Sequence, residues 1–266
     1  MSAQQRTADD GPRTTDNGTI LVLPYAVADG PANMALDEAM LEAAAHGESA
    51  YLRFYGWSEP TLSLGYFQRI AEVRADPRWA GRPIVRRPTG GGAIWHHHEL
   101  TYAVAVPPDS PMVRPNTALY RAVHGAIAAV LAGRGIPARR RGDEASAPGD
   151  GPDRPLLCFT GWDPEDIVGM GHKLVGSAQR RRGGAVLQHG SVLLARSPDV
   201  PELAGICDVA ERLPGQPGDW EEPLRGRIAA ALGLEPRAIG IPDPLRSRAL
   251  ELERSIYRTA AWTDAR

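Results

Sequence analysis

The stretch Arg86-Arg87-Pro88-Thr89-Gly90-Gly91-Gly92-Ala93-Ile94-Trp95-His96 decides how this chain is interpreted. Its three consecutive glycines follow a short strand-like run at 84–87. Backbone without side chains approaches a ligand closely and presents its N–H groups to a carbonyl or a phosphate. The stretch has neither the residue order of a P-loop nor the GxGxxG spacing of a dinucleotide fold, so neither motif is predicted. A triple glycine is also typical of a plain flexible turn, so its meaning depends on the rest of the chain.

A second stretch, Gly171-His172-Lys173-Leu174-Val175-Gly176-Ser177-Ala178-Gln179, places a lysine in an otherwise apolar, glycine-flanked strand pattern. Gln188-His189-Gly190-Ser191 then leads into another strand pattern at 191–194. One explanation of Lys173 is an edge-strand lysine that points to solvent. The other is a reactive amine, and the residues of this stretch alone leave both open.

The local patterns predict an α+β fold. Asp29 as N-cap and Pro31 in the first turn predict a helix over 33–45. An apolar stripe with three- and four-residue steps predicts a second helix over 117–131, ended by Gly133 and Gly135. Two closing helices are expected at 220–232 and 244–262, and strands at 20–23, 51–55, 61–66, 84–87, 101–106, from 156, and at 191–194. The strands cluster without regular βαβ alternation, which favours α+β.

The bulk properties indicate an ordinary globular protein. With 30 Lys and Arg against 32 Asp and Glu in 266 residues, the net charge of -2 gives no general affinity for nucleic acid or anionic membranes. No apolar run approaches the roughly 18 residues that span a bilayer. Two cysteines and a polar beginning at 1–18 without a secretory leader predict a soluble, cytoplasmic protein. We expect a disordered tail at 1–18 and a mobile loop at 142–154.

Three motifs together resemble one known superfamily. RRPTGGGAIWHHHELTYAV, HKLVGSAQ and QHGSVLL, in this order and at these separations, are similar to lipoate ligase A, the octanoyltransferases and the biotin ligases. ANMALDEAM and LRFYGWSEPTLSLGYFQ look like the N-terminal part of the same family, so the resemblance covers about 21–194. It implies a single catalytic domain over 19–266, with mixed sheets and flanking helices around an acyl tunnel and no separate accessory C-terminal domain.

The resemblance also implies the site residues. Lys173 would contact the acyl carbonyl, and backbone N–H groups at 176–178 would be candidates for the oxyanion hole. The residues implied to bind the substrate are Arg87, Thr89, Gly90, Gly91, Gly92, His96, Gly176, Ser177, Ala178, Gln188, His189 and Gly190.

Two branches of this superfamily do different chemistry, and Cys158 favours one of them. A ligase activates free lipoate with ATP and Mg, whereas an octanoyltransferase takes its acyl group from acyl carrier protein, usually through a cysteine. Leu157-Cys158-Phe159 resembles the Cys-Phe element that precedes the lysine motif in octanoyltransferases similar to ligase A. A free thiol has a pKa of about 8.5, and a neighbouring ammonium lowers such a value. Lys173 supplies that charge if the two side chains meet.

We therefore expect an octanoyltransferase without a cofactor. It would move an octanoyl or lipoyl group from octanoyl-acyl carrier protein, through a thioester on Cys158, to a lysine of a lipoyl domain or of the glycine-cleavage H protein. Gly92 departs from this branch, in which the third glycine is often Arg, so an ATP-dependent lipoate ligase stays open as an alternative. A second alternative is an inactive acyl-binding scaffold. For Cys158 itself, the alternative to a nucleophile is a purely structural role as a small buried hydrophobic residue.

The remaining clusters are assigned no chemistry. On a strand, His96 and His98 would share one face, but no complementary ligands follow, so a metal site is not predicted. The basic runs at 139–141 and 180–182 are expected to be solvated faces or docking sites for acidic partner proteins, and nucleic acid binding is not predicted. Cys207 lies outside every motif and is expected to be structural.

Overall fold

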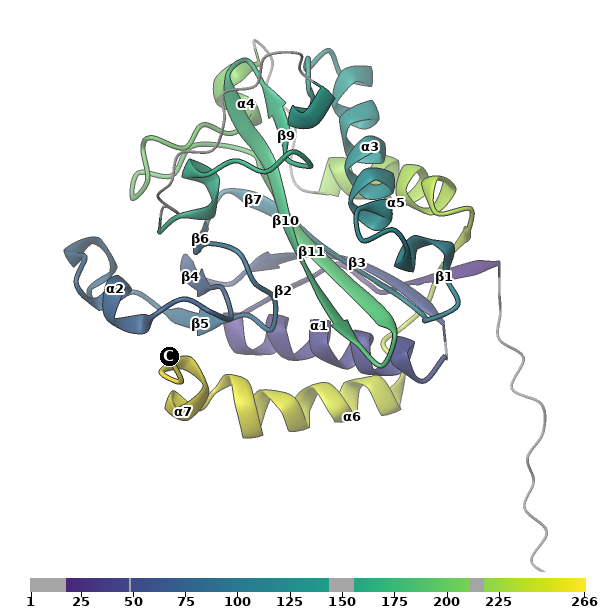
Figure 1. The fold of residues 1–266 in the computed structure, drawn as a ribbon, viewed down its shortest axis with the longest axis horizontal. Helices are drawn as coiled ribbons and strands as arrows, with labels where there is room; N and C mark the ends of the chain where they lie inside the picture. The colour runs from purple at the N-terminus through teal and green to yellow at the C-terminus, as the bar shows by residue number, and fades with distance from the viewer. Residues whose placement is uncertain (1–17, 48, 144–155, 211–217) are drawn as a thin grey trace, which may run out of the picture.

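The computed structural model describes residues 18–47, 49–143, 156–210 and 218–266 (Figure 1). The tail predicted at 1–18 and the loop predicted at 142–154 fall outside these ranges except for 18 and 142–143, so both stay predictions. Within the described ranges, no helix is long and apolar enough to cross a membrane.

A nine-stranded mixed sheet forms the centre of the molecule. The neighbours of β3 (Ala50–Trp57) include two parallel strands, β1 (Thr19–Val22) and β2 (Ala26–Ala28), and the antiparallel β7 (Glu99–Val106). From β7 the sheet continues antiparallel through β11 (Ala185–Leu193), β10 (His172–Arg182), β9 (Ile167–Gly169) and β8 (Arg139–Arg140). At the other edge β12 (Glu235–Ala238) pairs with β1 in parallel. This mixed pairing, with flanking helices, confirms the predicted α+β class.

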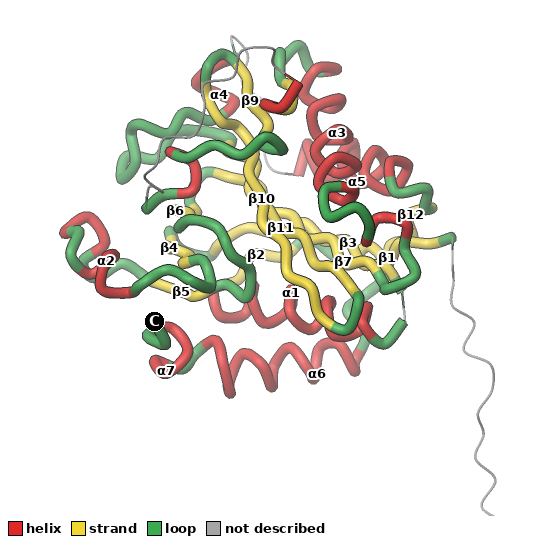
Figure 2. The backbone as a smooth tube through the Cα atoms, viewed as in Figure 1, coloured by secondary structure: helices red, strands yellow, loops and turns green. Residues whose placement is uncertain are grey.

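Helices cover both faces of this sheet (Figure 2), because successive side chains of a strand point to opposite faces and β3 carries apolar side chains on both. Leu52 and Phe54 of β3 pack in the cluster that contains α3 (Ala118–Gly133) and α5 (Gly218–Ala231). Tyr51 and Tyr55 of the same strand pack in the opposite cluster, with α1 (Gly30–Ala45) and α6 (Asp243–Leu252).

A second, three-stranded sheet carries the glycine-rich stretch. In it β4 (Thr61–Leu64) pairs in parallel with β5 (Ile84–Arg86) and antiparallel with β6 (Ile94–His96), so the three glycines connect β5 to β6. The remaining short elements are α2 (Ile70–Arg74), η1 (Pro77–Trp79), η2 (Pro111–Val113), η3 (Arg141–Asp143), η4 (Cys158–Thr160), α4 (Ile206–Val209), η5 (Glu253–Tyr257) and α7 (Ala260–Thr263).

The helix starts follow the sequence, but one predicted helix is broken. Asp29 caps α1 by accepting a hydrogen bond of 3.1 Å from the N–H of Ala32, as predicted. The helix predicted over 244–262 instead consists of α6, the π-helical η5 and the separate α7. It breaks because Thr259 adopts an extended backbone and its side chain caps α7 by accepting from the N–H of Trp262.

Candidate active site

Cys158 and Lys173, the two residues predicted to be catalytic, are in contact. Lys173 Nζ lies 3.7 Å from Cys158 Sγ and donates a 3.0 Å hydrogen bond to the Cys158 carbonyl. The lysine is only 6% exposed, whereas the cysteine is half-buried. A solvent-facing lysine on an edge strand is therefore excluded, because β9 covers β10 at this point with Val168 opposite Lys173. An amine and a thiol at this distance can exchange a proton through a small movement.

Asp166 completes this cluster, and it is not among the residues predicted from the sequence. Its Oδ2 lies 2.8 Å from Lys173 Nζ, and both side chains are at most 5% exposed. Met170 and Gly171, both with positive φ, form the turn that folds β10 back along β9. This hairpin brings the residue before β9 next to the beginning of β10. The available signal in the sequence was Asp166 directly before the apolar run at 167–168, followed by a glycine turn that folds the chain back towards Lys173.

The charges in this cluster stabilise one another. Burial lowers the pKa of Lys173, but the neighbouring charges of Cys158 and Asp166 outweigh it and raise that pKa above its usual value. Burial raises the pKa of Asp166 to about 6, although the Lys173 ammonium opposes this rise. At neutral pH the pair is thus an ammonium and a carboxylate. The ammonium donates to Asp166 and to the Cys158 carbonyl, and its third N–H faces Sγ and, at 3.4 Å, the Gly161 carbonyl.

The glycine-rich loop holds the main chain of Cys158. The N–H of Ala93 donates to the Leu156 carbonyl at 2.8 Å, and the N–H of Cys158 donates to the Ala93 carbonyl at 2.7 Å. A Cβ on Gly92 would lie 2.9 Å from the Cys158 nitrogen and 3.0 Å from its Cα, so this close approach requires glycine. The strand predicted from 156 is wrong, because these two bonds form only an isolated bridge and the 3-10 turn η4 follows.

Arg87 fixes the shape of the same loop from inside the protein. Its buried guanidinium donates to the carbonyls of Ser63 at 2.7 Å, Gly90 at 3.0 Å and Gly92 at 2.9 Å. Burial lowers the pKa of Arg87 to about 10, which still leaves it a cation at neutral pH. Arg87 is thus placed to position the loop rather than to face solvent.

Arg86, its neighbour, points the opposite way and ties the C-terminal segment to the site. Its guanidinium donates to the carbonyls of Gly65 at 3.1 Å and Gln68 at 2.8 Å on one side, and of Thr263 at 2.8 Å on the other. Gly65 in turn packs against Gly91, whose carbonyl oxygen would lie 1.9 Å from a Cβ on Gly65. The C-terminal helix α7 and the turn at 65–68, which packs against the glycine-rich loop, therefore share one buried arginine as an anchor.

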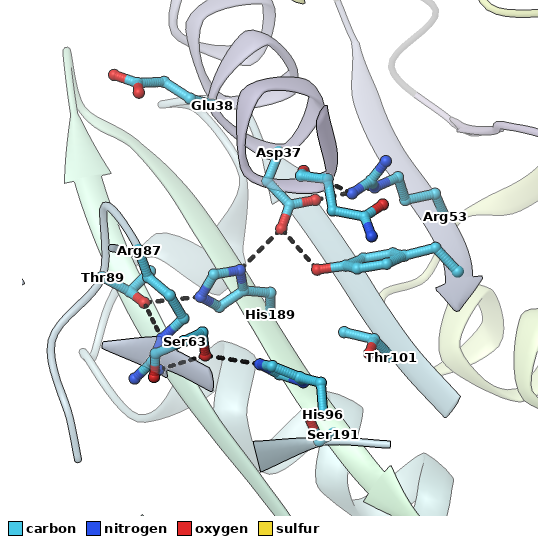
Figure 3. Close-up of polar contacts among 12 residues, drawn as sticks. Asp37, Glu38, Arg53, Ser63, Arg87, Thr89, His96, Thr101, His189 and Ser191 are labelled. Atoms are coloured by element: carbon cyan, nitrogen blue, oxygen red, sulfur yellow. Dashed lines mark hydrogen bonds and ion pairs between the residues drawn. The ribbon is translucent and has the colours of Figure 1, made fainter. Parts of the chain in front are cut away.

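Thr89 and His189 connect the loop to helix α1 (Figure 3). Thr89 Oγ1 lies 2.7 Å from His189 Nε2, and His189 Nδ1 lies 2.8 Å from Asp37 Oδ2. Asp37 also accepts hydrogen bonds of 2.9 Å from Arg53 Nε and Tyr55 Oη. Burial raises the pKa of Asp37, but Arg53 and His189 lower it more, so it is a carboxylate. This series of hydrogen bonds gives the ANMALDEAM segment, which contains Asp37, a role as a buried support of the glycine-rich loop.

His96 lies in a similar buried network and not on a metal-binding face. Its Nε2 lies 2.6 Å from Ser63 Oγ (Figure 3). Its Nδ1 lies 2.6 Å from Glu99 Oε1, and its ring stacks on Trp57. The expected shared face of His96 and His98 is wrong, because β6 ends at His96 and the chain turns there. Among the residues with described positions, no group of three His, Cys, Asp or Glu side chains could hold a metal ion.

Predicted site residues on β10 and β11 lie near His124 of α3, which is also not among the residues predicted from the sequence. Ser177 Oγ lies 2.7 Å from His124 Nε2, and Gln188 Nε2 donates to Tyr102 Oη at 3.1 Å. Burial lowers the pKa of His124 to about 4, so it is neutral. Gly176 leaves room for the lysine, since a Cβ there would lie 2.7 Å from Lys173 Cε. The signal for His124 was a histidine next to the apolar stripe of the predicted helix at 117–131.

The other predicted features lie apart from this cluster or stay untested. Gly190 and Ala178 are paired with Ser177 and His189 across β10 and β11. A cavity of about 460 Å³ lies elsewhere, lined by residues of α1, α2, β5 and the C-terminal segment, so the acyl tunnel stays a prediction.

The basic runs are at least partly paired within the chain, for example Arg182 with Glu38 and Glu42. Docking of acidic partners also stays a prediction. Cys207, in α4, lies outside the site.

Comparison with known proteins places this geometry in a family. The protein-family model described as lipoyl protein ligase A/B catalytic domain matches residues 29–212 of this chain. Octanoyltransferase LipM of Symbiobacterium thermophilum is 39% identical over 219 residues, which are 80% of this chain and 76% of that protein. Octanoyltransferase LipM of Kyrpidia tusciae is 42% identical over 172 residues, 63% of each chain, so this alignment spans less than two thirds of the relative.

Two solved structures share the fold. A crystal structure of lipoate-protein ligase A bound with ATP aligns with a TM-score of 0.72 at 24% identity, over 93% of this chain and 98% of that chain. The second is a bipartite lipoate protein ligase from Thermoplasma acidophilum, from a structural analysis that also includes its E2 lipoyl domain. It aligns with a TM-score of 0.70 at 22% identity, over 93% of this chain and 96% of that chain. At these identities the likeness shows the fold alone.

Proposed function

Since the chain belongs to the lipoyl protein ligase A/B catalytic domain family, we propose that it transfers an octanoyl group from a carrier thioester to a protein lysine. The observation that carries this proposal is the contact between Cys158 and Lys173, with Sγ and Nζ 3.7 Å apart. The relatives named octanoyltransferase LipM, at 39% and 42% identity, support it. A thioester intermediate requires a nucleophilic sulfur beside a group that handles its proton, and the site has both.

In the first half-reaction, Cys158 Sγ attacks the thioester carbonyl of the donor. A carbon–sulfur bond to Cys158 forms, the carbon–sulfur bond to the donor breaks, and the thiol proton passes through Lys173 to the departing donor sulfur. The backbone N–H groups at 176–178 are our candidates for stabilising the oxyanion. In support, β9 begins at Ile167 opposite Val175, so the edge of β10 that faces away from β11 is not paired with β9 from Gly176 onward.

In the second half-reaction, the amine of the acceptor lysine attacks the thioester on Cys158. A carbon–nitrogen bond forms, the bond to Cys158 breaks, and the surplus proton of the amine passes through Lys173 to the sulfur. Lys173 thus begins and ends each half-reaction as an ammonium, in agreement with its raised pKa. Because thioester to amide is downhill, the transfer needs no ATP.

The donor we propose is octanoyl-acyl carrier protein, and the acceptor is a lipoyl domain or the glycine-cleavage H protein. The study of the archaeal ligase includes an E2 lipoyl domain, which supports an acceptor of this class. The ligase alternative depended on Gly92, where related octanoyltransferases often carry Arg. The contact of Gly92 with the main chain of Cys158 explains this glycine by packing, without ATP chemistry.

The test is a transfer reaction without ATP. The purified chain is incubated with octanoyl-acyl carrier protein and a lipoyl domain, and both proteins are followed by intact mass. We expect an octanoylated lipoyl domain and a transient octanoyl adduct on the enzyme, both of which Cys158→Ser abolishes while Cys207→Ser, outside the site, preserves them. Modification that requires ATP and free lipoate and survives Cys158→Ser would instead establish the ligase. No modification under either condition would favour the scaffold.

A further inference from the structure

Lys173 is the only lysine in the chain. The 30 basic residues are 29 Arg and this one Lys. A guanidinium stays protonated at any pH that proteins tolerate, so the arginines do not act as amine nucleophiles. An enzyme that we propose to acylate lysine thus carries one lysine amine of its own, and that amine lies beside its nucleophile.

This position exposes Lys173 to a side reaction of the acyl-enzyme. The acyl carbon would be bonded to Cys158 Sγ, which is 3.7 Å from Lys173 Nζ, so the amine competes at a very high effective concentration. Attack by Nζ would form a carbon–nitrogen bond, break the carbon–sulfur bond, release the sulfur as a thiolate and leave a proton to solvent. The product is an amide on Lys173, which cannot be passed on, and the enzyme would be inactivated. Only the neutral amine can attack, because an ammonium has no free electron pair.

Asp166 is the anion that opposes this reaction once the sulfur is acylated. A thioester sulfur carries no charge, so Cys158 then stops stabilising the ammonium, whereas the Asp166 carboxylate stays 2.8 Å from it. Both side chains are buried, so water screens this attraction weakly. The Cys158 carbonyl also accepts from Nζ, at 3.0 Å, which holds the nitrogen in place.

The other titratable groups near Lys173 do not favour loss of the proton from its ammonium. Besides Cys158 of η4 and Asp166 before β9, the site includes His124 of α3 and Asp163, whose N–H donates to Asp166 at 2.7 Å. His124 is neutral near pH 7, so it does not repel the ammonium. The charge of Lys173 in the acyl-enzyme therefore depends on Asp166.

We propose that Asp166 is a positioning residue that keeps Lys173 an ammonium in the acyl-enzyme and so prevents its octanoylation by Cys158. This inference rests on the proposed function, because it requires an acyl group on Cys158. It assigns Lys173 as a latent self-modification site of the enzyme.

The test compares wild type, Asp166→Asn and Glu165→Gln after loading with octanoyl-acyl carrier protein without an acceptor. Neutral hydroxylamine removes thioesters and leaves amides, and intact mass with peptide mapping then locates what remains. The single lysine makes the result simple to read, since Lys173 and the terminal amine are the only amines. Glu165 is the matched control because it is adjacent and ion-paired, with Arg121 and Arg140 rather than with Lys173.

We expect Asp166→Asn to accumulate a hydroxylamine-resistant octanoyl group on Lys173. A fall of one unit in the lysine pKa raises the free amine about tenfold, so the rate of this modification should rise at least about tenfold. Wild type and Glu165→Gln should stay almost free of it, and adding Cys158→Ser to Asp166→Asn should abolish it. An Asp166→Asn enzyme that carries the labile thioester without the resistant adduct would overturn the inference.

A pH series on wild type tests the same inference without a variant. The resistant adduct should increase as the pH rises and the ammonium loses its proton, and Asp166→Asn should reach each level at a lower pH. An adduct on Lys173 whose rate does not change with pH would overturn the inference. A wild-type enzyme that forms no thioester at all would contradict the proposed function instead, so the two failures are distinguishable.

Discussion

Gly92→Ala is the substitution whose effect the structure defines most sharply. The new Cβ would lie 2.9 Å from the Cys158 nitrogen, 3.0 Å from its Cα and 3.2 Å from the Leu156 oxygen, whereas ordinary contact begins at 3.4 Å. All three are main-chain atoms, so no side chain can rotate away. The Cys158 segment would have to move by about half an ångström, against the two hydrogen bonds that pair it with Ala93.

The expected losses follow from this displacement. Overpacking of this kind costs about 1–3 kcal/mol of stability. Misplacement of a reacting group by about 1 Å costs about 10²-fold in rate, so about half that distance should slow acylation of Cys158 about tenfold. The first is measured by thermal unfolding, and the second by rapid-quench intact mass with octanoyl-acyl carrier protein in excess.

Gly125→Ala is the matched control. Gly125 lies in α3 with an exposed position and no atom within 4 Å of a Cβ, so alanine should stabilise the helix by about 1 kcal/mol and leave acylation unchanged. If Gly92→Ala melts like wild type and is acylated at the wild-type rate, the argument that the glycine-rich loop positions Cys158 is refuted.

Three further outcomes are expected. Lys173→Arg keeps a cation beside Cys158, but a guanidinium does not release its proton, so turnover measured by lipoyl-domain mass should fall about 10²-fold or more. Burial lowers the pKa of His124 from 6.5 to about 4, so between these pH values the unfolded state binds a proton that the native state does not. The free energy of unfolding should therefore decrease by about 3 kcal/mol as the pH falls from 6.5 to about 4. Urea unfolding should show this loss in wild type and little of it in His124→Gln. Thr89→Val leaves His189 Nε2 without its partner and should cost about 1–3 kcal/mol in thermal unfolding, and an unchanged melting temperature would contradict this support.

Local signals predicted the elements well where the residues concerned are neighbours in the chain. The cap by Asp29, the strand at 101–106 and the helix at 117–131 depend on spacing and turn chemistry, and each is present. The helix predicted over 244–262 was wrong because apolar spacing continues through a threonine that caps a new helix. Periodicity reports which face is buried, but it does not report a local cap that interrupts the helix.

The candidate site was predictable only in part, for a related reason. The meeting of Cys158 and Lys173 was expected from the resemblance to a family, since no local rule brings a 3-10 turn against a strand 15 residues later. Asp166 was missed because its partner is reached only through the β9–β10 turn, and His124 because it crosses from a helix to the sheet. Contacts between distant elements depend on packing, which a single sequence does not display.

Arg86 has a consequence for how this protein opens in solution. Its guanidinium bonds the turn that contains Gly65 and Gln68 and the C-terminal helix α7 at the same time, and every one of these partners is a main-chain carbonyl. Release of either segment would strand the same buried cation, which is costly, so the two segments open together. We therefore expect hydrogen–deuterium exchange to show them as one cooperative unit, whose amides share a single opening free energy although the two segments, around Gly65 and around Thr263, lie far apart in the sequence.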